Sequence, residues 1–139
     1  MQSEHRLVQL FVYHVGERVD LVIAPPGSGK TTAVRTWLDS AQDAAVQIWL
    51  EDHSIDSLSQ LPRNPDRPTF VVLDDYRFDS GTDSAILRIV DETPDTLHFV
   101  LTTDGTPSKP LLDRVDDGTV RVTTHADLQR ALAPTSQLG

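Results

Sequence analysis

The stretch "LVIAPPGSGKTT", residues 21–32, decides which fold this sequence encodes. Residues 24–31 fit the pattern A-x-x-x-x-G-K-T, a phosphate-binding-loop pattern with Ala24 in place of the usual first glycine. The pattern follows an apolar run typical of a buried strand and opens a stretch with apolar residues at helical spacing. Because strand, glycine-rich loop and helix occur in the order that phosphate binding requires, we predict a binding loop rather than a chance run of small residues.

Each residue type in this loop suits contact with a phosphate chain. Gly27 and Gly29 allow a positive φ and let the backbone approach a ligand without a Cβ in the way. Successive N–H groups then form an anion nest at the positive end of the following helix. We expect Lys30 to bridge the β and γ phosphates, Thr31 to hold Mg²⁺ and Thr32 to contact the α phosphate. The residues of this loop predicted to bind nucleotide are Pro26, Gly27, Ser28, Gly29, Lys30, Thr31 and Thr32.

A pair of acids ends a second apolar run, "TFVVLDDY", residues 69–76. Four apolar residues followed by an acid have the form of a Walker B segment, and ligands of parallel sheets bind at the carboxyl ends of strands. Asp74 is therefore expected to hold Mg²⁺ through a water, opposite Thr31. Asp75 is expected to orient or deprotonate the attacking water, a step for which many additional-strand ATPases use Glu. Lys30 and Asp75 are the candidate catalytic residues.

Short apolar runs alternate with amphipathic stretches along the whole chain. The predicted strands are residues 19–24, 45–50, 69–74, 97–102 and 119–123. The predicted helices are residues 29–41, 81–92 and 125–133, with weaker candidates at 55–61 and 110–115. Ser80 with Asp83, and Thr124 with Asp127, have the spacing of helix capping boxes. This alternation predicts one α/β domain with a mostly parallel sheet of about five strands and helices on both faces.

The loop and the alternation together predict the three-layer fold of P-loop NTPases, in its additional-strand class. In that class the fourth strand lies between the first strand and the Walker B strand, and its polar end commonly senses the γ phosphate. The run "LHFVLTTD", residues 97–104, ends in two threonines. Thr103 or Thr102 is expected to take this sensing role, and Thr103 completes the predicted nucleotide-binding set.

The composition excludes several classes of function. The chain carries 21 acidic and 12 basic residues, for a net charge of -9, which disfavours direct binding to nucleic acid. It has no cysteine, which removes disulfides and thiolate metal sites. No apolar run approaches the roughly 18 residues of a membrane span, and the first residues lack a signal-peptide layout, so we expect a cytoplasmic protein. We expect one nucleotide-binding domain at residues 1–133 and a flexible tail at 134–139.

These motifs together resemble the ATPase domain of the large LuxR-type, maltose-regulator-like STAND proteins, over about residues 7–131. The phosphate loop and the segment "FVVLDDY", residues 70–76, carry most of the likeness; "IWLEDHSID", residues 48–56, adds a weaker match. The resemblance implies an ATP- and Mg²⁺-binding module of a transcription regulator. The family usually has Arg after the sensor strand, where this chain has Asp104. The family's DNA-binding regions have no counterpart in this chain, so the resemblance implies no DNA binding here.

The leading hypothesis is a nucleotide-dependent switch with slow ATPase activity, read by another protein domain or a regulator subunit. A degenerate, non-hydrolysing interaction module is one alternative, favoured by Asp104. A small-molecule or nucleotide kinase is another, since kinases also begin with a phosphate loop. A kinase needs a lid with basic residues, and the lid-sized segment 104–117 holds only Lys109 and Arg114 beside several acids.

Overall fold

The fold is known from a computed structural model that describes residues 18–25, 27, 29–40, 46–93 and 96–124. The predicted helix at residues 125–133, with its capping box at Thr124 and Asp127, and the predicted tail at 134–139 lie outside this range, apart from Thr124 itself. Two predicted loop residues, Pro26 and Ser28, also lie outside it. No helix within the described residues is both long enough and apolar enough to span a bilayer.

Five parallel strands form one sheet in the order β2-β3-β4-β1-β5. The strands are β1 (Val19–Ile23), β2 (Val46–Leu50), β3 (Thr69–Leu73), β4 (Leu97–Thr103) and β5 (Val120–Thr124). Each strand lies within one residue of its predicted bounds. The fourth strand is inserted between β1 and β3, which confirms the strand arrangement of the additional-strand class.

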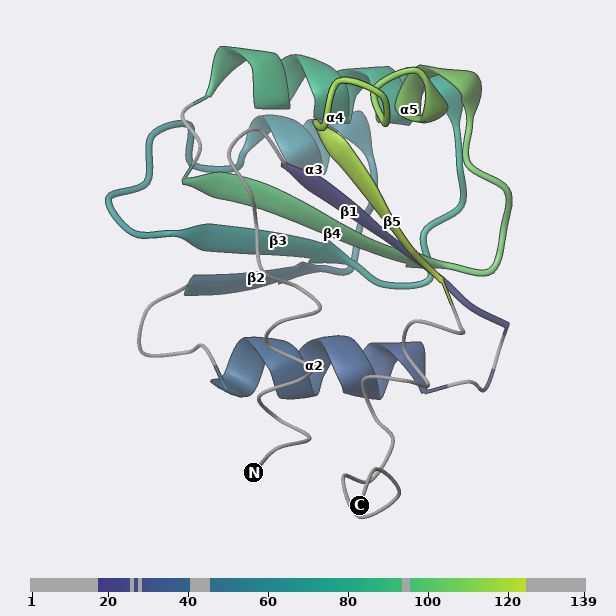
Figure 1. The fold of residues 1–139 in the computed structure, drawn as a ribbon. Helices are drawn as coiled ribbons and strands as arrows, with labels where there is room; N and C mark the ends of the chain where they lie inside the picture. Colours follow the sequence, from purple (N-terminus) through teal and green to yellow (C-terminus); the bar gives the residue numbers. More distant parts are fainter. Residues whose placement is uncertain (1–17, 26, 28, 41–45, 94–95, 125–139) are drawn as a thin grey trace.

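Helices cover both faces of this sheet and give the molecule three layers (Figure 1). The helices are α2 (Lys30–Ser40), α3 (Ile55–Ser59), α4 (Ser80–Glu92) and α5 (Lys109–Leu112). Of the helices in the described ranges, α2 lies on one face and α3, α4 and α5 lie on the other (Figure 1). The predicted α/β, three-layer fold is confirmed, including the two short helices that the sequence indicated only weakly.

Two apolar clusters, one on each face, hold the layers together because successive strand residues point to opposite sides. The α2 side buries Val22, Ala24, Ala33, Val34, Leu38, Phe70, Val72 and Val100. The other side buries a larger set that includes Leu21, Val71, Leu73, Ile86, Ile89, Phe99 and Leu101. Burial of the central strands on both sides fixes their register, and so fixes which side chains meet where the strands end.

The start of α4 corrects one prediction. The expected capping box of Ser80 and Asp83 is wrong, because the N-cap is Asp79, whose carboxylate accepts hydrogen bonds from the Thr82 N–H and hydroxyl at 2.9 Å. These bonds lower the pKa of Asp79, the Thr82 backbone bond contributing most. A capping box at Ser80 would place the first helical residue after Ser80, but α4 already begins at Ser80. As a result Asp83 lies on the buried face of the helix.

Candidate functional site

The loop after β1 has the backbone that the sequence predicts. Gly27 and Gly29 have φ of 77° and 87°, in the left-handed region that favours glycine. A Cβ built at either position meets no atom within 4 Å, so open space lies beside the loop backbone. The loop is fixed at its start by the Ala24 N–H, which donates to the Thr103 carbonyl oxygen at 3.0 Å. Helix α2 then begins at Lys30 and presents its first turn to this edge of the sheet.

A hydrogen bond joins the two predicted metal ligands. The Thr31 hydroxyl, in the first turn of α2, donates to Asp74 Oδ1 at 2.8 Å, across 43 residues of sequence. Asp74 follows directly on β3, and both side chains are half-buried. A hydroxyl and a carboxylate oxygen are ligands of the kind that Mg²⁺ prefers. The structure therefore brings the phosphate loop and the Walker B segment to one point at the carboxyl end of the sheet.

Thr102, at the end of β4, belongs to the same cluster. It is fully buried; its hydroxyl donates to Asp74 Oδ1 and accepts the Asp75 N–H at 2.8 Å. Thr103 points to the opposite face, where its hydroxyl accepts the Gly105 N–H at 3.0 Å and is itself buried. Alternation along the strand explains the difference, since Thr102 shares the α2 side with Thr31. Of the two threonines considered for γ-phosphate sensing, Thr102 is the one that contacts the Walker B acid.

Asp75 occupies a strained turn just after Asp74. Its φ is 55°, a left-handed conformation that is uncommon outside glycine and costs free energy. The turn is held on both sides of this residue, because the N–H groups of Asp75 and Tyr76 bond to the hydroxyl and the carbonyl oxygen of Thr102, each at 2.8 Å. The Asp75 side chain is exposed, so its carboxylate can reach a water molecule, as its predicted role requires. Strain of this kind, held by its surroundings, is typical of functional positions.

The other predicted residues of the loop are only partly described. Thr32 lies in the first turn of α2 and is exposed, as contact with a phosphate would require. Lys30 is placed as the first residue of α2, and its side chain lies outside the described part of the structure, as do Pro26 and Ser28.

Tyr76 anchors this turn to the helix layer, and the sequence predictions did not include it among the site residues. Its ring is 2% exposed, and its hydroxyl donates to Asp83 Oδ1 in α4. Burial, followed by the hydrogen bond to Asp83, raises the pKa of Tyr76. The ring also contacts His53 and Phe78, at centroid distances of 5.7 and 5.6 Å. The turn that carries Asp74 and Asp75 is thus tied to α4 and to the segment before α3.

Comparison with known proteins places the fold in a recognised class. No family model matches the chain, and a search among curated proteins finds no match. Among solved structures, the structure of C. elegans PCH-2 matches over 88% of this chain, with a TM-score of 0.52 and 21% sequence identity. PCH-2 is an AAA+ ATPase, and the chain spans 40% of its length. With the strand order and the loop geometry, this likeness shows that the chain has a P-loop NTPase-like fold.

Proposed function

We propose that this chain binds Mg–ATP at the carboxyl end of its sheet and hydrolyses it slowly, as the nucleotide-dependent switch of a STAND-type signalling or transcription-regulatory protein. The observation that carries the proposal is the 2.8 Å hydrogen bond between Thr31 and Asp74. It joins the two side chains that hold and face the metal in P-loop enzymes. The fold that the chain shares with the AAA+ ATPase PCH-2 supports the same conclusion.

The residues at this point fit the ligands proposed. The Thr31 hydroxyl and the Asp74 carboxylate provide hard oxygen ligands, and a protein needs few of them because phosphates and waters complete the shell of Mg²⁺. The open space beside Gly27 and Gly29 leaves room for phosphate against the backbone. When bound, Mg²⁺ would neutralise phosphate charge at this edge. A nucleoside triphosphate with its Mg²⁺ is therefore the class of ligand that these groups suit.

Each protein group then has a separate task. The backbone N–H groups of the loop and the first turn of α2 bind phosphate oxygens, and Lys30 adds a positive charge. Asp75 orients a water and accepts a proton at its exposed carboxylate. Thr102 positions both acids, because one hydroxyl contacts the Asp74 side chain and the Asp75 backbone. Loss or gain of the γ phosphate would change the contacts of Thr31 and Asp74, and a partner domain would detect the resulting change in these loops.

The regulatory role rests on the resemblance of residues 70–76 and of the phosphate loop to STAND proteins. A non-hydrolysing interaction module is the second candidate. Two residues favour it: Asp75 is shorter than the usual Glu, and Asp104 places an exposed negative charge just after β4.

The geometry of segment 104–117 disfavours a kinase. Lys109 pairs with Asp113 at 2.9 Å, and Arg114 pairs with Asp91 and Asp117, also at 2.9 Å. The two basic residues that a substrate lid would need therefore already contact acids of the same chain.

Binding and turnover measured on one sample separate the two remaining candidates. Calorimetry with Mg–ATP gives the affinity, and phosphate release gives the rate. We expect Asp75→Asn to keep the affinity and lower the rate at least about 100-fold, since general-base catalysis contributes on that order. Thr31→Ala should weaken binding in Mg²⁺ far more than in EDTA, while Thr31→Ser, which keeps the hydroxyl, should bind as the wild type does.

Each outcome has a clear meaning. Binding without turnover above buffer, with and without candidate partners, would favour the non-hydrolysing module. Absence of Mg–ATP binding by folded wild-type protein would refute both candidates.

A further inference from the structure

A groove lies between α3 and α4, on the face of the sheet opposite α2. Its volume is about 160 Å³, and it is lined by both helices and by Arg63 of the connector that follows α3. Leu58 and Ile89 form its apolar floor and are 1% and 4% exposed. Ile55 stands at its mouth and is 52% exposed, the highest exposed fraction of the three exposed large hydrophobic side chains among the described residues. The groove thus offers an apolar floor with an accessible apolar rim.

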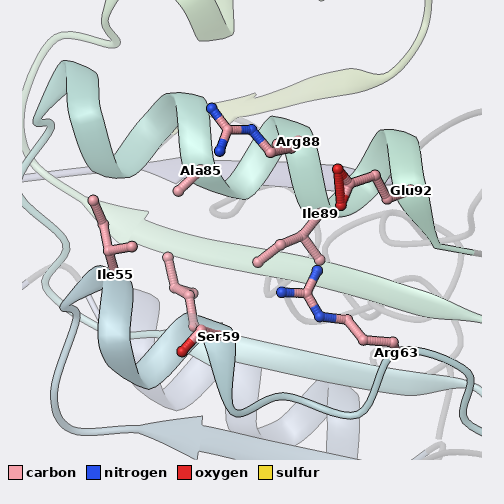
Figure 2. A pocket seen from close by; sticks show the side chains of 8 residues that line it. Ile55, Ser59, Arg63, Ala85, Arg88, Ile89 and Glu92 are labelled. Atoms are coloured by element: carbon pink, nitrogen blue, oxygen red, sulfur yellow. The ribbon is translucent and has the colours of Figure 1, made fainter.

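Two guanidinium groups flank this floor. Figure 2 shows the Arg63 side chain extending toward Ile89 and the Arg88 side chain rising from α4. Neither arginine makes an ion pair or a hydrogen bond with any residue in the described ranges. Glu92 is the one acid that lines the groove, so the side chains that line it carry a net charge of +1 on a chain whose net charge is -9.

Two other arginines of the described chain use their guanidinium groups within the fold. Arg18 is buried and donates to the carbonyl oxygens of Leu97 and Val90. Arg35 stacks over the ring of Trp49 at 4.2 Å. Arg63 and Arg88, in contrast, present their donors beside apolar surface, where a planar guanidinium binds a carboxylate strongly and with defined geometry.

We propose that this groove binds a short, acidic, amphipathic segment of a partner protein. One apolar side chain of the segment would occupy the space above Leu58 and Ile89, and its carboxylates would bind Arg63 and Arg88. The volume suits one large side chain better than an extended ligand, and the charge selects an acidic segment. Helix-in-groove recognition uses apolar anchors of this kind, and complementary charges around the anchors add specificity. This proposal does not depend on nucleotide binding.

The test uses the full chain and a library of random twelve-residue peptides displayed on phage. Enriched peptides are synthesised, and their dissociation constants are measured by fluorescence anisotropy. We expect the enriched sequences to share acidic residues around one Leu, Ile, Met or Phe. Arg63→Glu/Arg88→Glu should weaken their binding at least about ten-fold, because like charges replace opposite ones at the interface. Ile55→Ala, which truncates an exposed side chain, should weaken it several-fold.

The matched control is Arg77→Glu/Lys109→Glu, which changes the net charge equally at two exposed residues outside the groove. It should bind the peptides as the wild type does, and circular dichroism should show all variants folded. Peptides that bind the groove variant and the wild type equally, or a selection without acidic enrichment, would overturn the proposal. Wild-type self-association that Arg88→Glu abolishes would identify a second copy as the occupant and would also overturn it.

Discussion

Tyr76→Phe removes one oxygen atom and leaves a buried carboxylate without its described partner. Asp83 is 0% exposed, its Oδ1 accepts only the Tyr76 hydroxyl among the described residues, and its Oδ2 is buried with no hydrogen-bond partner there. Leaving a buried polar group without its hydrogen-bond partner costs about 1–3 kcal/mol, and more where that group is charged. We therefore expect the variant to lose roughly 2–4 kcal/mol of unfolding free energy while keeping the ring contacts of Tyr76 with His53 and Phe78.

Urea unfolding followed by circular dichroism measures this loss, and the thermal midpoint should fall by roughly 6–16 °C. A double-mutant cycle with Asp83→Ala isolates the pair. The double variant leaves neither group unsatisfied, so it should be at least as stable as Asp83→Ala alone. The coupling energy should then be at least as large as the loss in Tyr76→Phe, roughly 2–4 kcal/mol. A loss below about 0.5 kcal/mol in Tyr76→Phe, or additivity in the cycle, would refute the reasoning, because such values are typical of surface substitutions.

Three further predictions follow from the same geometry. Asp79→Ala should lower the free energy of unfolding more than Ser80→Ala does, because Asp79 is the residue that caps α4. Equal losses for the two variants in urea melts would contradict this. Folding raises the pKa of Tyr76 above its ordinary value of about 10, so the stability that this raised pKa contributes is complete below about pH 10 and is lost progressively at higher pH. Between about pH 9 and pH 11, the free energy of unfolding of the wild type should fall by about 1.4 kcal/mol more than that of Tyr76→Phe. Equal losses in the two proteins would contradict the raised pKa. Thr102→Val should lower the free energy of unfolding by about 1–3 kcal/mol, because it removes the hydroxyl that bonds to Asp74 and Asp75. It should also slow ATP turnover more than Thr103→Val does. Equal effects on turnover would show that Thr102 does not position the two acids.

The sheet could be predicted from the sequence because its central strands are buried on both sides and read as continuous apolar runs. "TFVVL" and "LHFVL" contain no competing helical spacing, so their bounds are set within one residue. The position of the phosphate loop followed from the glycines, whose positive φ values the structure confirms. Parallel strands also end at one edge, which is why Asp74 could be expected near Thr31.

Contacts between layers were harder to predict, because residue spacing does not show where a helix begins. Ser80 and Asp83 have capping-box spacing, yet Asp79 begins α4 and turns Asp83 inward. A signal for this was present, since Asp83 lies three residues before Ile86 and seven before Val90, on the apolar face of the helix. The choice between Thr102 and Thr103 depends on strand register, which a single sequence leaves open by one residue.

Mg–ATP binding by the wild-type chain, measured by calorimetry beside Lys30→Ala, tests the central claim most directly. The proposed site predicts one saturable binding event that requires Mg²⁺ for full affinity. Replacing Lys30 should weaken it at least about 100-fold, because the lysine supplies the one cationic side chain expected at the phosphates. Wild-type protein that is folded and binds no nucleotide, or Lys30→Ala that binds as tightly as the wild type, would contradict the account.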